Sequence, residues 1–434
     1  MNKCKLVLIG AGSASFTIRL VADMLQSTTV DEWEIGLVDI NPQALAVGEG
    51  VVKRLIQDRG ASAKCEACVE RSELLPGADV VVSSIHVGGR DAWRKDFRIP
   101  EKYGVVQPIG DTVMAGGISR ALRQIPAMLD IAADVHRLCP AALLFNYANP
   151  MSAICRAINR AGEHPVVGLC HGIQGTVAYL CSLIDVPANE VTALYMGVNH
   201  MAWVTHLTRN GESLWPAIEA QVEKLGDQCD NPWSWDLYRT FGAFPSDRDA
   251  HVIEFYPEYF PERDYYGKRW GEQVLYAPDF MVDSTREEYQ KMAAIAAGEA
   301  PLDASQFGRR RGVMEALVPI IDSIRADACV IQPMNVPNTA VPGIPKGFVI
   351  ETPTVASAAG CLPLSLPPMS PGILGTVCEH LYGIEITVEA ALTGDRDLVV
   401  QSLLYDRCVT SRPAAEALAD ELLAAHREHL PQFE

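Results

Sequence analysis

The sequence predicts an α/β fold, in which a Rossmann-like, doubly wound parallel sheet is followed by an α+β catalytic domain. Two observations lead to this prediction. In the first third of the chain, short and almost continuously apolar segments alternate with helical patterns, which is typical of a parallel sheet covered on both faces. After about residue 200 the alternation stops. We therefore expect one domain over residues 1–195 and a second over residues 196–434.

The strands and helices of the first domain are expected in alternation along the chain. Each predicted strand is a short run of Val, Ile, Leu and other apolar residues, and each predicted helix is longer and carries mixed side chains. The strands are expected at residues 5–9, 33–39, 78–84 and 142–147, and the helices at 16–26, 42–59 and 118–138.

The second domain is expected to be less regular. Aromatic residues and prolines gather between Trp233 and Phe280, a composition that favours a pocket wall over a regular sheet. The proline-rich stretches Pro333–Pro353 and Cys361–Pro371 are predicted to be loops or edge strands, because proline cannot donate to a strand ladder. Helices are expected at residues 287–297, 311–326, 373–391 and 414–429.

Composition and charge exclude several classes of partner. The 434 residues are 48% hydrophobic and carry a formal net charge of −18, which argues against binding to nucleic acid or to an anionic membrane surface. No apolar run reaches the roughly 18 residues of a membrane span, and the apolar run near Met1 is too short for a signal peptide. The 12 cysteines are scattered, so we expect them to be reduced and the protein to be cytoplasmic.

A glycine-rich turn after the first strand predicts a dinucleotide site. Gly10 and Gly12 allow a tight turn that brings backbone N–H groups to a pyrophosphate, and Ser13 and Ser15 lie in the same turn. Ser15 stands where a third glycine is usual. Asp39 ends the second strand, where a carboxylate can accept hydrogen bonds from ribose hydroxyls; this favours NAD over NADP. The alternative is a turn with a structural role only.

Two residues further along could chelate a transition metal. Cys170 and His200 each follow an apolar run, so both are expected at strand ends that face one crevice. A thiolate and an imidazole suit a first-row divalent ion, with substrate oxygen atoms completing the shell. On spacing alone, a buried thiol and a core histidine remain the alternative.

Several segments together resemble glycoside hydrolase family 4, the NAD- and metal-dependent glycosidases. Their order and spacing match from residue 5 to about 210, and more loosely to the C-terminus. The similarity is greatest to the branch of α-galactosidases (melibiases), α-glucosidases and α-glucuronidases. The matching segments are Gly10–Ser15, Val87–Gly89, Ile109–Thr112, Gly116–Ile118, Asn146–Met151, Gly168–His171 and Val198–His200.

The resemblance implies cofactors, ligands and a substrate class. Cys170 and His200 would bind a manganese-like ion, and Asn149 would contact substrate. His171, after the cysteine, implies an α-glycosidase for unphosphorylated sugars; Gly172 departs from the serine of the melibiases and leaves the sugar open. An α-galactoside is favoured, with an α-glucuronide, α-galacturonide or α-glucoside as alternatives. NAD would oxidise C3, a base would remove the C2 proton, the C1–O bond would break by elimination, and water would add.

The resemblance also suggests which residues act as general acid and general base. His171 is the candidate acid, since imidazole titrates near neutrality; it could instead only hydrogen-bond a hydroxyl. Asp111 would modulate the base and metal, or simply cap the following turn. In place of the tyrosine base of phospho-glycosidases, this chain offers Asp247 or Asp249, and His251 third or as a substrate contact.

Three further expectations concern substrate, alternatives and assembly. Arg94 matches an arginine near substrate in the phospho-enzymes and would suit a carboxylated sugar, although it could lie in a solvated charged loop. The competing function is a 2-hydroxy-acid dehydrogenase, because the lactate and malate enzymes share the predicted fold but need no metal. A homodimer or homotetramer is expected, with a small carbohydrate as substrate.

Overall fold

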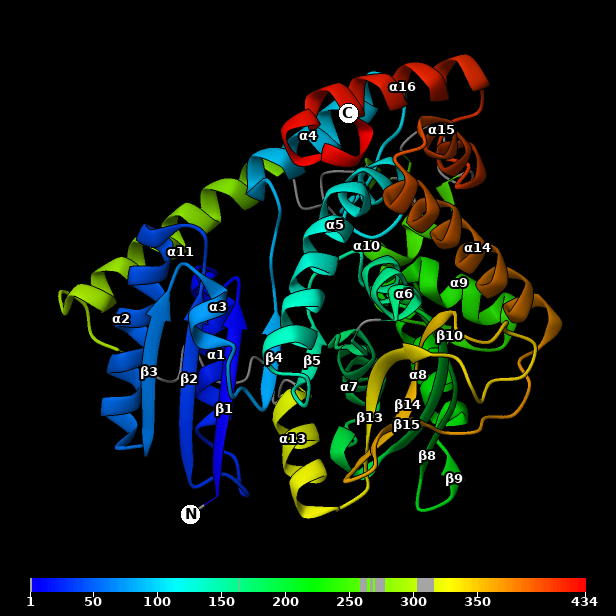
Figure 1. Ribbon diagram of the computed structural model, residues 1–434. Coiled ribbons are helices and arrows are strands. Elements are labelled where there is room, and N and C mark those ends of the chain that lie inside the picture. The colour runs from blue at the N-terminus through cyan, green and yellow to red at the C-terminus, as the bar shows by residue number, and fades with distance from the viewer. Residues whose placement is uncertain (1, 163, 258–263, 266–267, 270–277, 303–315) are drawn as a thin grey trace.

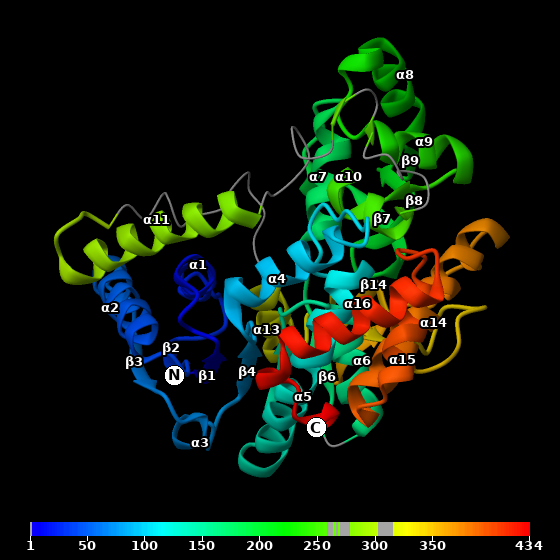
Figure 2. The ribbon, with the colours of Figure 1, turned by 90° about the horizontal axis from the view of Figure 1, so that it is seen from above.

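The first third of the chain forms six parallel strands in the order β3-β2-β1-β4-β5-β6. The computed structural model describes residues 2–434 except residue 163 and segments 258–263, 266–267, 270–277 and 303–315. Helices lie on both sides of these strands (Figures 1 and 2), so the predicted Rossmann-like fold class is confirmed. The strands are β1 (Lys3–Ile9), β2 (Glu32–Val38), β3 (Ala63–Cys68), β4 (Val80–Ser83), β5 (Leu143–Asn146) and β6 (Val166–Gly168).

The helices of this half begin and end where local sequence signals allow. The helix expected at residues 42–59 has these bounds, because the Asn41 side chain accepts hydrogen bonds from Gln43 and Ala44 and Gly60 ends it at φ +58°. The helices are α1 (Ala14–Met24), α2 (Pro42–Arg59), α3 (Arg71–Leu74), α4 (Gly89–Glu101), α5 (Met114–Leu138), α6 (Met151–Ala161) and α7 (Gly172–Ser182).

The second half extends the same sheet with antiparallel strands, in the order β6-β13-β14-β7-β8-β10. The expected boundary between residues 195 and 196 therefore falls inside β7, and strands from both sides of it share one sheet. The strands are β7 (Thr192–Val198), β8 (Met201–Arg209), β9 (Glu212–Ser213), β10 (Phe244–Pro245), β13 (Val330–Pro337), β14 (Val349–Ser357) and β15 (Gly360–Pro363), with β11 (Asp264–Tyr265) and β12 (Lys268–Arg269) in a separate hairpin.

The prediction that Pro333–Pro353 forms loops or edge strands is wrong for β13 and β14, which lie inside the sheet. Pro333 and Pro353 are register partners, and two prolines can oppose each other where neither N–H is needed between the strands. The neighbouring strands β6 and β7 pair further along, at Asn335 and Glu351. Proline content therefore misled the assignment because the ladder bonds lie elsewhere on the same strands.

The remaining helices cover the two ends of the sheet. In Figures 1 and 2, α11 lies along α2, and α16 lies along α4 near the C-terminus. The helix expected at 311–326 begins outside the described residues, and α15 was not predicted. These helices are α8 (Trp215–Leu225), α9 (Pro232–Phe241), α10 (Asp249–Val252), α11 (Pro278–Ala297), α13 (Leu317–Ala326), α14 (Pro371–Thr393), α15 (Arg396–Tyr405) and α16 (Arg412–Ala425).

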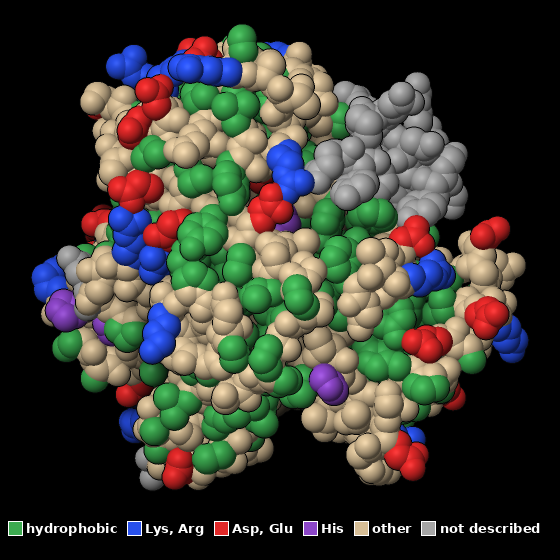
Figure 3. Space-filling view, turned by 90° about the vertical axis from the view of Figure 1, so that its right-hand side faces the viewer, with side chains coloured by type: hydrophobic (Ala, Val, Ile, Leu, Met, Phe, Trp, Pro, Cys, Tyr) green, Lys and Arg blue, Asp and Glu red, His purple; other side chains and the backbone are tan. Residues whose placement is uncertain are grey.

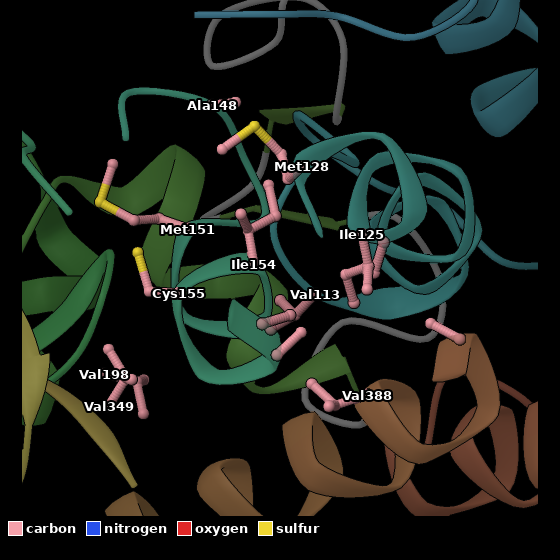
Figure 4. Close-up of a cluster of buried hydrophobic side chains, with 14 of the residues drawn as sticks. Val113, Ile125, Met128, Ala148, Met151, Ile154, Cys155, Val198, Val349 and Val388 are labelled. Atoms are coloured by element: carbon pink, nitrogen blue, oxygen red, sulfur yellow. The ribbon is translucent and has the colours of Figure 1, made fainter. Parts of the chain in front are cut away.

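A large apolar core joins α5, α6 and α14 behind the carboxyl ends of the strands. Figure 4 shows Ile125 and Met128 of α5 near Ile154 of α6, with Val388 of α14 close by. These side chains are at most 1% exposed. The segment that leads into α5, residues 109–113, is thus anchored on a rigid support.

Figure 3 shows one face of the molecular surface. Acidic and basic side chains are interspersed there, with hydrophobic ones between them, so this face carries no continuous basic patch. No helix in the described part of the chain is both long and apolar enough to cross a membrane.

Candidate active site

The glycine turn after β1 packs directly against the end of β2. The Gly12 N–H donates to Asp39 Oδ2 at 2.7 Å, and the Asn41 N–H donates to Oδ1 at 2.8 Å. A Cβ on Gly12 would lie 2.7 Å from the same Asp39 oxygen. Gly10 has φ +92°, and a Cβ on it would lie only 2.9 Å from the Ser84 backbone carbon. Both glycines are therefore required by close contacts.

This turn has the shape that a dinucleotide needs. It joins β1 to the first turn of α1, so backbone N–H groups at the helix N-terminus face the end of the sheet. Ser13 is exposed and occupies the N-cap position without a capping hydrogen bond from its own side chain. The Ser15 side chain lies outside the described residues. Gly10 and Gly12 thus present no Cβ atoms at the place where a dinucleotide would approach the turn.

Three potential metal ligands, one of them in the turn after β7, meet in the described part of the chain. One ligand atom from each of Asp111, His200 and His251 lies within 4.8 Å of the other two. The rings of the two histidines are 3.9 Å apart between centroids. Asp111 comes from the segment before α5, His200 from the turn after β7, and His251 from α10. Three distant parts of the chain therefore build one polar centre.

Hydrogen bonds fix the orientation of His200. The Thr112 hydroxyl donates to Asp111 Oδ1 at 2.7 Å and also lies 2.9 Å from His200 Nδ1. Because a hydroxyl has one hydrogen, the second contact requires Nδ1–H to be the donor. His200 Nε2 is then left with its lone pair, as a metal ligand needs. The Asn149 amide donates to Asp111 Oδ2 at 3.0 Å and completes this network.

His200 also occupies an unusual backbone conformation. It is the second residue of the two-residue turn between β7 and β8, and its φ is +67°. A non-glycine residue in this region costs about 1 kcal/mol or more, and such strain is frequent at functional sites. Gly197 lies just before the turn, where a side chain would collide with the Met201 backbone. The turn therefore holds a histidine in a backbone conformation that glycine would adopt at a lower energetic cost.

The electrostatics of this centre favour an ionised carboxylate beside neutral imidazoles. Burial would raise the pKa of Asp111, but the charge of Arg120, the two imidazoles in their protonated form and the Thr112 hydroxyl outweigh it and hold the pKa below its ordinary value. Burial, and then the neighbouring His251, lowers the pKa of His200 to about 3. Burial lowers the pKa of His251 to about 4. Neutral imidazoles and an ionised carboxylate are the forms that bind metal.

Cys170 and His171 lie at the end of β6, next to this centre. Burial, with the charges of Glu351 and Asp247, raises the pKa of the Cys170 thiol well above its ordinary value. A thiol in such a place becomes a thiolate when a cation binds it. His171 is exposed and precedes α7. The three residues whose ligand atoms lie within 4.8 Å of one another include Asp111 and do not include Cys170. The joint binding of a metal by Cys170 and His200 stays a prediction.

The two candidate bases have different surroundings. Asp247 Oδ2 lies 3.7 Å from His251 Nε2, and its side chain is 16% exposed. Asp249 is 2% exposed and accepts from the Ser234 N–H at 2.8 Å, the Ser234 hydroxyl at 2.6 Å and the Trp233 N–H at 3.0 Å. These donors belong to the first turn of α9, so Asp249 caps that helix. These contacts suit a structural role for Asp249, and its role as a base stays a prediction.

Two predicted substrate contacts remain to be placed. Asn149 follows β5, and its amide points at Asp111, inside the polar centre. Arg94 is on α4, where its guanidinium lies 3.4 Å from the carboxylate of Asp91, a residue that is largely exposed. The contact between Arg94 and Asp91 therefore lies on the surface of α4, whereas Asn149 belongs to the centre itself.

Sequence comparison identifies the family. A model of the family 4 glycosyl hydrolases matches residues 5–186, and a model of the family 4 C-terminal domain matches residues 195–409. The chain belongs to glycosyl hydrolase family 4. It is 30% identical to an α-glucosidase of Erwinia rhapontici (98% of both chains covered) and 28% identical to an α-galactosidase of Bacillus subtilis (99% of both).

Solved structures agree with this family fold. A 6-phospho-α-glucosidase from gut microorganisms, in complex with NAD and Mn²⁺, superposes with a TM-score of 0.85 at 17% identity, covering both chains completely. The lactate dehydrogenase of Cryptosporidium parvum reaches only 0.54 at 14% identity, with 90% of this chain and 98% of that chain covered. The dehydrogenases thus share the general fold, while the family 4 enzymes match it more closely.

Several residues of this family 4 site were missed by the sequence analysis. Thr112 orients His200, and Arg120 donates to the Asn149 carbonyl at 3.0 Å while its charge acts on Asp111. Glu254, 1% exposed, accepts from the Ile109 and Gly110 N–H groups, both at 2.6 Å, and so holds the segment before Asp111. The Gly-Asp-Thr run had marked Thr112, but nothing in the sequence shows that Glu254 reaches this turn.

Proposed function

We propose that this chain hydrolyses the α-glycosidic bond of an unphosphorylated sugar, with an α-galactoside favoured, using NAD and a divalent ion such as Mn²⁺. The observation that carries the proposal is the Asp111–Thr112–His200 network, which presents His200 Nε2 in a family 4 fold. Relatives named α-galactosidase and α-glucosidase support an α-linked substrate. An α-galacturonidase of Thermoanaerobacterium saccharolyticum, 28% identical over 97% of this chain and 95% of its own, supports the uronide alternative.

The residues present fit both cofactors. The Gly10–Gly12 turn would hold the NAD pyrophosphate and Asp39 the ribose, while His200 and Cys170 would hold the metal. When bound, NAD would supply a hydride acceptor and the metal would supply a Lewis acid. Ionised Asp111 would place negative charge beside that cation and keep His200 in the tautomer that binds it.

Proton transfer would be divided between the two sides of the centre. Asp247 is the better candidate for removing the C2 proton, because its carboxylate faces the polar centre near His251. His171, exposed at the start of α7, would protonate the leaving oxygen. Asn149, anchored through Asp111 and Arg120, would orient a sugar hydroxyl. Water would then add at C1 and the hydride would return to C3.

Location and assembly belong to the same proposal. A cytoplasmic protein suits an enzyme that draws on NAD and carries many reduced cysteines; the 12 cysteines are free in the structure. We also expect a homodimer or homotetramer. Size-exclusion chromatography with light scattering on the full chain measures the assembly directly.

The function is tested by release of p-nitrophenol from the α-galactoside, α-glucoside, α-glucuronide and α-galacturonide. Each substrate is tried with NAD, Mn²⁺ and a thiol reductant, and again with NAD or Mn²⁺ withheld. Hydrolysis that needs both additions is the expected result, and the fastest substrate names the sugar. Hydrolysis that persists without NAD, or metal-independent NAD reduction by a 2-hydroxy acid, would contradict the proposal.

A further inference from the structure

Four strands place one row of residues between the two proposed metal ligands. Gly168 of β6 pairs with Asn335 of β13, Asn335 pairs with Glu351 of β14, and Glu351 pairs with Gly197 of β7. Cys170 follows the first member of this row, and His200 follows the last. Residues in register across a sheet point to the same face. The Asn335 and Glu351 side chains therefore share a face between two glycines, which leave room for them.

Glu351 makes contacts toward both ligands. Its carboxylate accepts a hydrogen bond from the backbone N–H of His200, and its Oε2 lies 3.5 Å from the Asn199 side-chain amide nitrogen. The Asn199 amide also donates to the Cys170 thiol. An amide NH₂ has two hydrogens, so one Asn199 side chain can serve Glu351 and Cys170 together. One carboxylate is thereby connected to both ends of the predicted metal pair.

The burial of this group indicates that a positive charge belongs nearby. Glu351 is 1% exposed, Asn199 1% and Asn335 0%. Within the described part of the chain, Glu351 Oε1 has no well-aligned hydrogen-bond partner, and the neighbouring Asn335 amide interacts with this carboxylate and lowers its pKa against the effect of burial. A buried carboxylate costs several kcal/mol unless a cation compensates it. A divalent ion on Cys170 and His200 would supply that charge.

We propose that Glu351 is a positioning residue for the metal ligands, which it orients by holding the Asn199–His200 turn and, through the Asn199 amide, the Cys170 thiol. This inference rests on the proposed metal-dependent function. It assigns no contact between Glu351 and substrate. The strained conformation of His200 gives the turn a reason to need such support, since its φ is +67°.

The test is Mn²⁺ binding by the full chain, followed through the electron paramagnetic resonance signal of free Mn²⁺. Glu351→Gln keeps the size of the side chain but leaves only one acceptor for the two donors and removes the charge. We expect Mn²⁺ to bind about 10- to 100-fold more weakly, the usual effect of losing a group that orients metal ligands. NAD affinity, measured by fluorescence titration, should stay unchanged. Glu351→Asp should recover part of the Mn²⁺ affinity.

A matched control lies on the same strand. The Thr354 side chain is fully buried, and the alternation of a strand places it on the other face of β14 from Glu351. Thr354→Val should leave Mn²⁺ affinity unchanged. If Glu351→Gln binds Mn²⁺ with wild-type affinity, the inference is overturned. If Glu351→Gln does not fold, wild-type Mn²⁺ affinity in Glu351→Asp overturns the inference instead. Wild-type protein that binds no Mn²⁺ overturns the proposed metal site itself, so the two failures are distinguishable.

Discussion

The two halves of the sheet build their parts of the site in different ways. In the parallel half, the glycine turn and Asp39 lie at the ends of the adjacent strands β1 and β2, which are also close in sequence. At the other site, Cys170 follows β6, the last of the parallel strands, and His200 follows the antiparallel strand β7; β13 and β14 lie between these two strands. A local motif thus builds the proposed nucleotide site, whereas long-range strand insertion builds the proposed metal site.

This difference predicts that the two sites can be damaged separately. The glycine turn depends on contacts within residues 10–41 and with Ser84, and the polar centre depends on residues between 109 and 351. Variants in one half should therefore spare binding in the other. The following predictions test that separation.

The largest effect is expected from His200→Asn. The amide lacks the imidazole Nε2 that Thr112 orients toward the metal, so Mn²⁺ binding should be lost and kcat should fall by about 1,000-fold or more. NAD affinity should stay within about twofold of wild type, since the glycine turn is untouched. Calorimetric titration with each cofactor checks both statements. Loss of both affinities together would show that the halves are coupled.

The next largest effect separates two neighbouring carboxylates. Asp247→Asn should lower kcat by about 100-fold or more, as expected for a lost general base, with little change in stability. Asp249→Asn should instead lower the free energy of unfolding by about 1–2 kcal/mol, because it weakens the cap of α9. Urea unfolding and steady-state kinetics on both variants measure the difference. The reverse pattern would return the base role to Asp249.

In the parallel half, Gly12→Ala should weaken NAD binding by about 10- to 100-fold. The added Cβ would meet Asp39 Oδ2 at 2.7 Å and must displace it, a strain of about 1–3 kcal/mol. Mn²⁺ affinity should not change. Gly175→Ala is the control, because a Cβ there meets nothing within 4 Å. If Gly12→Ala bound NAD as tightly as wild type, the close contact with Asp39 would not explain why a glycine is needed at this position.

A smaller effect is expected on the pH dependence of the metal-free protein. The unfolded chain binds protons on His251 near pH 6.5, but the folded chain does so only near pH 4, because burial lowers this pKa. The stability that neutral His251 contributes is present above about pH 6.5 and is lost as the pH falls toward 4. His251→Asn should flatten this decline by about 3 kcal/mol in urea unfolding. An unchanged decline would exclude His251 as its source.

The sequence was sufficient wherever a signal is local. It placed α2 by its periodicity, and the turn at Gly10–Gly12 by glycine spacing next to a strand. It failed at β13 and β14, because their prolines suggested an edge and only the tertiary pairing shows where ladder bonds are needed. Glu351 could not be found for the same reason, since nothing near it in sequence relates to Cys170 or His200. The hydrogen bonds that Asp249 accepts from the N–H groups of α9 could not be found either, because these residues meet only in the folded chain.

The central claim is that the polar centre removes the proton from C2 of a glycoside whose C3 has been oxidised. Hydrolysis of the preferred substrate in D₂O, with NAD and Mn²⁺, tests it through the NMR spectrum of the released sugar. Proton removal and return from solvent predicts deuterium at C2 of the product. A product that keeps its original hydrogen at C2 throughout turnover would contradict the account.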